Sequence, residues 1–158
     1  MNENLNYSPM LNMSFPYFEI TRSPLENIVA VPALGQEKII SVNKIVRNSG
    51  NFINSTNGII LPNTGILCYQ VGVYMQYTIT ANCIIQIFTY LNDHKICRYQ
   101  YVLNTTGANY GYCNFSGSHY VIKDSVFSIR AKMENTTNDL TKIYTRGTEI
   151  FLNYLGIK

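Results

Sequence analysis

The sequence predicts an all-β fold, an antiparallel two-sheet sandwich, from three observations. First, β-forming stretches recur with turn residues between them every ~8–12 residues, which is the usual spacing of sandwich strands. Second, the chain of 158 residues contains 13 tyrosines but only 13% charged residues, about half the usual ~25%. Third, no apolar pattern keeps the helical period for longer than a turn. We therefore expect one domain of immunoglobulin or jelly-roll kind, with about eight to ten short strands.

A long strand over residues 66–77 is the element around which we expect the others to be arranged. It follows a Pro-Asn-Thr-Gly turn at 62–65, and its side chains alternate between two faces. One face is apolar and suits a core: Leu67, Tyr69, Val71, Val73, Met75 and Tyr77. The other face is mixed and suits solvent or a partner: Cys68, Gln70, Gly72, Tyr74 and Gln76.

The other strands follow from turn residues placed between β-forming stretches. Before the long strand we expect strands at 27–31, at 38–47 with a kink at Asn43, and at 58–61. After it we expect 83–91, 96–103, 112–120, 126–133, 143–145 and 149–155. The first two of these form a hairpin around residues 92–94. Residues 116–118 predict a bulge within 112–120, and residues 146–147 divide the last two strands.

Residues 1–35 are predicted to form an extended attachment arm, and residues 36–158 to form the jelly-roll sandwich. Prolines at 9, 16 and 24 prevent a long helix in the arm, because each removes a backbone donor and restricts the residue before it. Met10, Phe15, Tyr17 and Phe18 are candidates for docking onto a partner or a neighbouring subunit, and a disordered arm is the alternative. The segment has neither the pattern of a signal peptide nor the ~20 apolar residues of a membrane helix.

Four cysteines stand at positions 68, 83, 97 and 113, without a Cys-x-x-Cys pair. This spacing does not suit a zinc ribbon. Buried free thiols are one interpretation, because cysteine packs as a small hydrophobic residue. The alternative is one disulfide that joins Cys83 to Cys113 or to Cys97.

The pattern of ionisable residues does not indicate an enzyme. Nine carboxylates and two histidines are spread thinly, and no phosphate-binding loop or metalloprotease motif occurs. Cys113 and His119 could share one strand face, but no third group orients them. Asp93 with Asn92, or Asp139 with Asn138, would make only a poor calcium site. We therefore predict no catalytic residue, no metal and no cofactor; and the net charge of +3, which is scattered, predicts no nucleic-acid partner.

Several motifs from Glu37 onward resemble the C1q/TNF-like jelly-roll family. Asn48-Ser49-Gly50, Gly58-Ile59-Ile60 and the turn 62–65 that opens the long strand are similar to an early strand, turn and strand of that family. The stretch 121–133 resembles a family strand–turn–strand unit, and 149–158 its final aromatic-rich strand. The resemblance implies a jelly roll that assembles as a homotrimer. No collagen-like stalk precedes the domain, so a surface protein of a virus, a phage or a bacterial spore is the expected kind of relative.

The resulting hypothesis is a non-enzymatic structural protein on the surface of a particle: a virion, a phage capsid or fibre head, or a spore coat. Its trimer interface would use aromatic and apolar residues, because aromatics are enriched at the centre of interfaces. The candidates are Leu67, Tyr69, Val71, Tyr74, Tyr120, Phe151 and Tyr154. The arm would contact other structural proteins of the particle, with no insertion into a membrane. The alternative is a receptor- or glycan-binding module that uses the segments 104–111 and 134–147.

Overall fold

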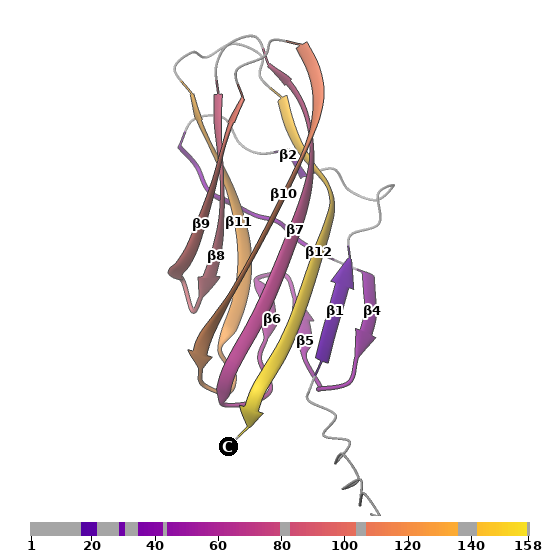
Figure 1. Cartoon of the computed structure of the whole chain (residues 1–158), viewed down its shortest axis with the longest axis vertical. Helices are drawn as coiled ribbons and strands as arrows, with labels where there is room; N and C mark the ends of the chain where they lie inside the picture. Colours follow the sequence, from indigo (N-terminus) through magenta and orange to yellow (C-terminus); the bar gives the residue numbers. More distant parts are fainter. Residues whose placement is uncertain are drawn as a thin grey trace, which may run out of the picture.

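A computed structural model describes residues 17–21, 29–30, 35–42, 44–79, 83–103, 107–135 and 142–157 of the chain. These residues form two six-stranded antiparallel sheets (Figure 1). Sheet A has the order β10-β7-β12-β1-β4, with β2 paired to β12, and sheet B has the order β5-β6-β11-β8-β9, with β3 paired to β11. The strands are β1 Tyr17–Thr21, β2 Val29–Ala30, β3 Lys38–Ile39, β4 Lys44–Asn48, β5 Ile53–Ser55, β6 Gly58–Ile60, β7 Gly65–Ile79, β8 Cys83–Leu91, β9 His94–Leu103, β10 Gly107–Val121, β11 Val126–Asn135 and β12 Lys142–Ile157.

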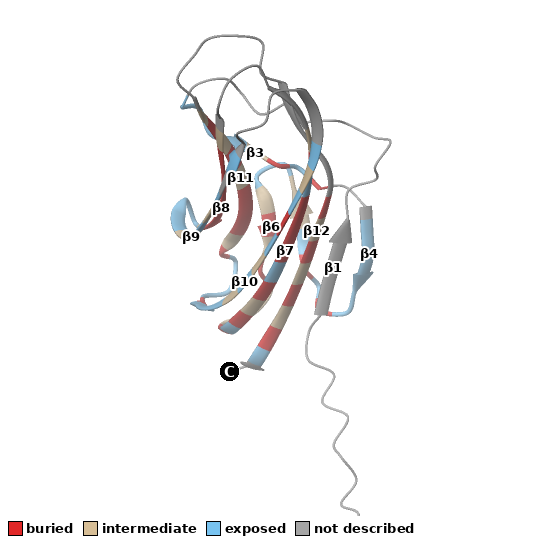
Figure 2. Ribbon diagram, turned by 45° about the horizontal axis from the view of Figure 1, so that its top comes forward, coloured by how far each residue is buried: buried red, intermediate tan, exposed pale blue. Residues whose placement is uncertain are grey.

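The long strand β7 lies between β10 and β12 in sheet A, as an organising element should. It pairs with β10 from Gly65 to Ile79 without a break in register. Figure 2 shows the alternation of buried and exposed positions along it. Its apolar face from Leu67 to Met75 is buried in the core, and the opposite face contains the exposed Tyr74. The period-two prediction for this strand is therefore confirmed over its described side chains.

The core fills the space between the two sheets. Sheet A contributes apolar side chains of β7 and β12, and sheet B contributes those of β8 and β11. The largest fully buried side chain is Tyr154, whose ring stacks on Phe52 with centroids 5.8 Å apart. Its hydroxyl donates a hydrogen bond to the backbone oxygen of Asn63 at 2.9 Å. This bond satisfies a polar group that would otherwise be buried without a partner.

Residues 38–47 were predicted to be one strand, but they form two strands in different sheets. Strand β3 pairs with β11 in sheet B, whereas β4 pairs with β1 in sheet A. The chain therefore crosses from one sheet to the other between these strands, where the sequence suggested only a kink. Ile40 and Val42 lie at this crossing with their side chains in the core.

Two further details of the predicted strands are corrected. No bulge occurs at residues 116–118, because the register with β7 is continuous there. Gly117 instead makes room for Tyr69, whose hydroxyl would lie 2.5 Å from a Cβ at position 117. The stretches 143–145 and 149–155 belong to one strand, β12, with an irregularity between Thr145 and Thr148.

The predicted boundary between an arm at 1–35 and a domain at 36–158 is also corrected. Strand β1 pairs with β12 on one side and with β4 on the other, so it lies within sheet A. Strand β2 pairs with β12 as well. Tyr17 and Phe18, two of the docking candidates, are thus part of a strand of the sandwich, whereas Met10 and Phe15 lie outside the described residues.

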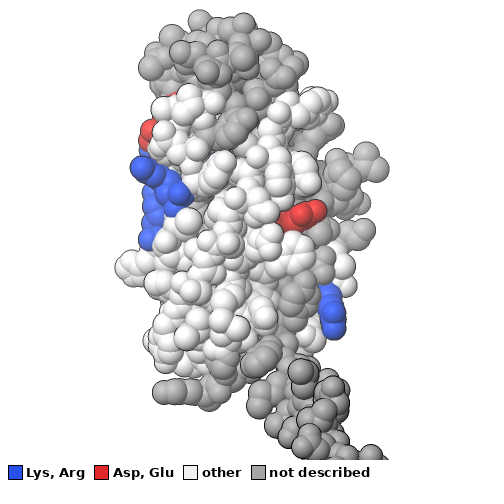
Figure 3. Space-filling view, viewed as in Figure 1, with Lys and Arg blue, Asp and Glu red and all other residues white. Residues whose placement is uncertain are grey.

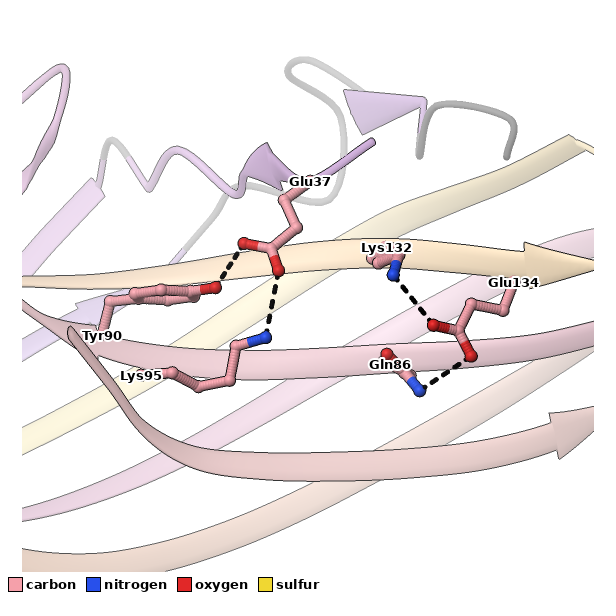
Figure 4. Close-up of polar contacts among 6 residues, drawn as sticks. All are labelled: Glu37, Gln86, Tyr90, Lys95, Lys132 and Glu134. Carbon is pink, nitrogen blue, oxygen red and sulfur yellow. Dashed lines mark hydrogen bonds and ion pairs between the residues drawn. The ribbon is translucent and has the colours of Figure 1, made fainter. Parts of the chain in front are cut away.

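Polar contacts hold the segment before β3 against the outer face of sheet B (Figure 4). The Glu37 carboxylate accepts a hydrogen bond from the Tyr90 hydroxyl and forms an ion pair with Lys95 at 3.1 Å. The Lys95 ammonium also lies 3.6 Å from the centroid of the Phe88 ring, a cation–π contact. Because Lys95 covers its ring, Phe88 is buried although its strand position faces away from the core. A second group of polar contacts on this sheet joins the side chains of Lys132, Glu134 and Gln86.

We expect the contribution of Glu37 to stability to depend on pH. Partial burial raises the pKa of Glu37, but the hydrogen bonds from Tyr90 and Lys95 outweigh it, so that the pKa lies below 4.5. A carboxyl group with a lowered folded-state pKa stabilises the fold above its unfolded pKa and loses this effect as the pH falls through the folded value. At pH 7 Glu37→Gln should lower the free energy of unfolding by about 0.5 kcal/mol, the typical value for a largely exposed pair.

Urea denaturation of wild type and Glu37→Gln at pH 7 and at pH 3 tests this expectation. The difference between the two proteins should be smaller at pH 3 than at pH 7, because the stabilisation by a carboxylate with a lowered pKa decreases as the pH falls toward its folded-state pKa. An equal difference at both values would show that the carboxylate charge is irrelevant and that the variant changes only packing.

Candidate functional site: the outer face of sheet A

The outer face of sheet A, over β7, β10 and β12, is the candidate functional surface. The pairing of β7 with β10 places Tyr74 opposite Tyr112 and Ile66 opposite Tyr120, while β12 brings Leu155 beside Ile66. All of these side chains are substantially exposed, as is Tyr110. The described part of this face therefore presents two groups of large apolar side chains to solvent, one around Ile66 and one around Tyr74, with the polar Gln70 and Ser116 between them.

Charged side chains are scarce on this face. In Figure 3 the surface over β10, β7 and β12 is almost free of charged groups, whereas Lys and Arg gather at its flank. Among the outward-facing residues of these three strands whose side chains the structure describes, the half-buried Glu149 is the only charged one. Depletion of charge together with exposed aromatics is the compositional pattern of the centre of a protein interface.

Tyr74 and Tyr112 form a fixed pair on this face. Their ring centroids are 4.3 Å apart, and the Tyr112 ring lies across Gly72 on the adjacent strand. A Cβ at position 72 would approach the Tyr112 hydroxyl to 2.7 Å, so the glycine leaves room for the ring. Desolvation raises the pKa of Tyr112, and the nearby Tyr74 and Glu149 raise it further. Side chains held in this way lose little conformational entropy when they enter an interface.

A shallow hollow of about 450 Å³ lies on the same face. Cys68, Gln70, Ser116, Phe151 and Asn153 contribute to its lining. The side-chain oxygen of Asn153 is enclosed and has no hydrogen-bond partner. A buried acceptor without a donor is energetically unfavourable, so a donor supplied by another chain would stabilise this surface.

The predicted interface residues divide into two groups. Tyr74 and Tyr120 are exposed on the outer face and Phe151 is half-buried there. The other four candidates, Leu67, Tyr69, Val71 and Tyr154, are buried in the core of the monomer. These four side chains cannot contact a second subunit, because they already fill the space between the two sheets, and the prediction is corrected for them.

Sequence reasoning missed Ile66, Tyr110, Tyr112 and Leu155, which share the outer face with Tyr74. The alternation along residues 66–77 gave the faces of one strand. It did not give the register that places β10 and β12 beside it. The segment 104–111 was predicted to be a binding loop, but its described residues, from Gly107 onward, belong to strand β10. Residues 136–141 of the second predicted loop lie outside the described residues.

The cysteines do not form the disulfide that was the alternative to free thiols. Cys113 has a free thiol and is buried on the inner side of β10, and Cys97 and Cys68 are free as well. Burial raises the pKa of the Cys113 thiol to about 12. A Cys113 thiolate is therefore not available at neutral pH, so a nucleophilic pair with His119 lacks its reactive form.

The described residues contain no cluster of three or more His, Cys, Asp or Glu side chains that could hold a metal ion. Within the same part of the chain no helix is long and apolar enough to cross a membrane.

Comparison with solved structures identifies the fold. No protein-family model and no curated protein sequence matches the chain. The globular domain of zebrafish complement 1qA protein superimposes with a TM-score of 0.59 at 8% identity, over 89% of this chain and 96% of that one. Murine APRIL superimposes with a TM-score of 0.54 at 11% identity, over 88% of this chain and 98% of that one. The chain thus has the C1q/TNF-like jelly-roll fold, as the sequence predicted; at these identities the likeness concerns the fold alone.

Proposed function

We propose that this protein is a non-enzymatic structural component of a particle surface and that it assembles as a homotrimer through the outer face of sheet A. The observation that carries the proposal is the exposed, nearly uncharged aromatic face over β7, β10 and β12. Water contact with so much apolar surface is unfavourable, and association with copies of the same chain removes it. The trimeric assembly implied by the resemblance to C1q/TNF-like domains supports three copies rather than two.

The role on a particle rests on composition and on the N-terminal segment. A charged fraction of only 13% suits a protein packed among others in a shell or fibre. Residues 1–16 precede the first described strand and contain Met10, Leu11, Met13 and Phe15. In this proposal they attach the head to other structural proteins of a virion, phage, fibre or spore coat. The attachment segment is thus shorter than the 35 residues expected from sequence.

Molar mass in solution tests the assembly. Light scattering on a sizing column should give the mass of three 18.0-kDa chains, under both reducing and non-reducing conditions. Tyr74→Asp places a carboxylate within the proposed interface and should shift the mass to a single chain, because a buried unpaired charge is strongly unfavourable. Val102→Asp, at an exposed apolar position of β9 in sheet B, is the matched control and should remain a trimer.

A single-chain mass for the wild-type protein at tens of micromolar would refute the assembly. Equal dissociation by Tyr74→Asp and Val102→Asp would place the interface elsewhere. Both variants need a cooperative thermal unfolding transition, which separates dissociation of a folded chain from unfolding; a lower midpoint is expected for a monomer, because assembly stabilises the fold.

Receptor or glycan binding remains a second role that the same fold supports equally well. It requires a recognition site outside the face that the trimer covers. A polar cavity on sheet B is a candidate for such a site.

A further inference from the structure

A polar cavity of about 440 Å³ opens on sheet B, the sheet opposite the proposed interface. It lies where two short strands pair with different parts of β11: β3 reaches Arg130 and Ala131, and β6 reaches Val126 and Phe127. Its lining residues include Ser128, which lies between these two pairings. The tip of the β8–β9 hairpin contributes Asn92 and Asp93. A cavity of this size lies within the usual range for small-ligand sites.

The hairpin tip is held rigidly against β11. Asn92 and Asp93 both have positive φ angles, 48° and 64°, which fixes a tight turn. The Asn92 side chain accepts a hydrogen bond from the backbone of Val126 at 2.8 Å and donates one to Ser125 at 3.0 Å. The cavity is therefore largely formed before any ligand arrives, which reduces the entropic cost of binding.

An ion pair forms one side of the cavity. A terminal nitrogen of Arg130 donates to one carboxylate oxygen of Asp93, and the guanidinium lies 4.1 Å from the centroid of the Tyr90 ring. The Asp93 side chain is 83% exposed, so its second oxygen can accept a hydrogen bond from a ligand. Arg130 has further N–H donors beyond the one that Asp93 uses. Donor and acceptor groups thus stand side by side at the opening.

The charges near this cavity balance. Arg130 faces Asp93, and the neighbouring Lys95 faces Glu37. An anionic ligand would meet the Asp93 carboxylate, and a cationic ligand would meet the Arg130 guanidinium. A neutral ligand that both donates and accepts hydrogen bonds avoids both repulsions. Ile39 and Val126 add apolar surface to the lining, and Asn57 adds an amide.

We propose that this cavity binds a neutral sugar unit of a glycan. The sugar hydroxyls donate hydrogen bonds to Asp93 and accept them from Arg130, and the C–H face of the sugar ring packs against Ile39 and Val126. A pyranose ring combines these features, because its hydroxyls donate and accept while its ring carbons are apolar. The proposal deepens the binding role of the previous section, and it does not depend on the trimer because the site lies on the other sheet.

A printed array of glycans ending in galactose, glucose, N-acetylglucosamine or sialic acid tests the proposal with the full-length protein. Binding to one or more neutral termini is expected. Asp93→Asn should weaken that binding about tenfold or more, because it removes a charged hydrogen-bond acceptor and the ion pair that orients Arg130. Asp124→Asn is the matched control, because Asp124 lies in another turn, at a positive φ of 67°, and outside the cavity. The affinity of this variant for the glycan should stay within about twofold of the wild-type affinity.

Asn57→Ala provides a second test, because the Asn57 side chain lines the cavity, is exposed and does not take part in the ion pair. This variant should also bind the neutral glycan more weakly than the wild type does. Absence of binding to neutral glycans, binding confined to sialylated ones, or equal effects of Asp93→Asn and Asp124→Asn would overturn the proposal. Thermal unfolding and molar mass are measured on the same samples. A correctly assembled trimer that binds no neutral glycan refutes the sugar site alone, whereas a sugar-binding monomer refutes the assembly alone.

Discussion

Removal of residues 1–26 should prevent the sandwich from folding, whereas removal of residues 1–16 should leave it folded. The longer truncation deletes β1, which pairs with β12 and β4 and connects them within sheet A. Each ladder hydrogen bond contributes about 1 kcal/mol net, so the loss of both ladders approaches the ~5–15 kcal/mol of a typical domain. The open edge of β12 would also expose unpaired backbone groups to other chains.

Thermal unfolding followed by far-ultraviolet circular dichroism distinguishes the two truncations. The shorter one should unfold cooperatively near the wild-type midpoint, and the longer one should lack a cooperative transition. Equal midpoints would show that β1 does not contribute to the sandwich. The shorter truncation also tests attachment: its folded head should no longer join the particle, and normal incorporation would refute the role proposed for residues 1–16.

Tyr154→Ala should lower the free energy of unfolding by about 4 kcal/mol. The substitution loses the favourable free energy of transferring a large aromatic side chain from water into the core, and it leaves a cavity. Tyr154 has no exposed surface, stacks on Phe52, and donates a hydrogen bond to Asn63. Tyr154→Phe keeps the ring and removes only this hydrogen bond, so its loss should be about 1 kcal/mol.

Chemical denaturation of the wild-type protein and the two variants measures these losses. All three are compared at one fixed protein concentration, because the stability of an oligomer depends on concentration. Equal, small effects of both substitutions would contradict the burial of Tyr154. A loss that appears in molar mass but not in the unfolding of the monomer would restore Tyr154 as an interface residue.

The strands that the sequence predicted best are those with strong alternation. Strand β8 occupies 83–91 as predicted, and β7 extends the predicted 66–77 by a few residues. In both, each side chain's environment follows from the local alternation of the backbone. The prediction of a single strand at 38–47 was wrong, because the apolar residues of this segment suit a strand in either sheet. Only pairing partners far along the chain decide which sheet each part joins.

The candidate site was only partly accessible to sequence reasoning. Alternation placed Tyr74 on the mixed face of its strand and Tyr69 on the apolar face. Residue type alone did not decide whether an apolar face, or Tyr154, belongs to the core of the monomer or to an interface. The cavity near Arg130 left no recognisable signal. It joins the tip of one hairpin, the middle of β11 and the ends of two short strands, which are separated by long stretches of sequence. Such a constellation arises only when distant segments pair.

By itself, the sequence determined the strand content, the two faces of β7, the family resemblance and the scarcity of charge, because these depend on local alternation and composition. The tertiary structure decided that β1 belongs to the sandwich, which aromatic residues are core and which are surface, and where Arg130 meets Asp93. The physical reason is register: a shift of one residue in strand pairing turns every side chain to the opposite face, and only the packed sheets fix that shift.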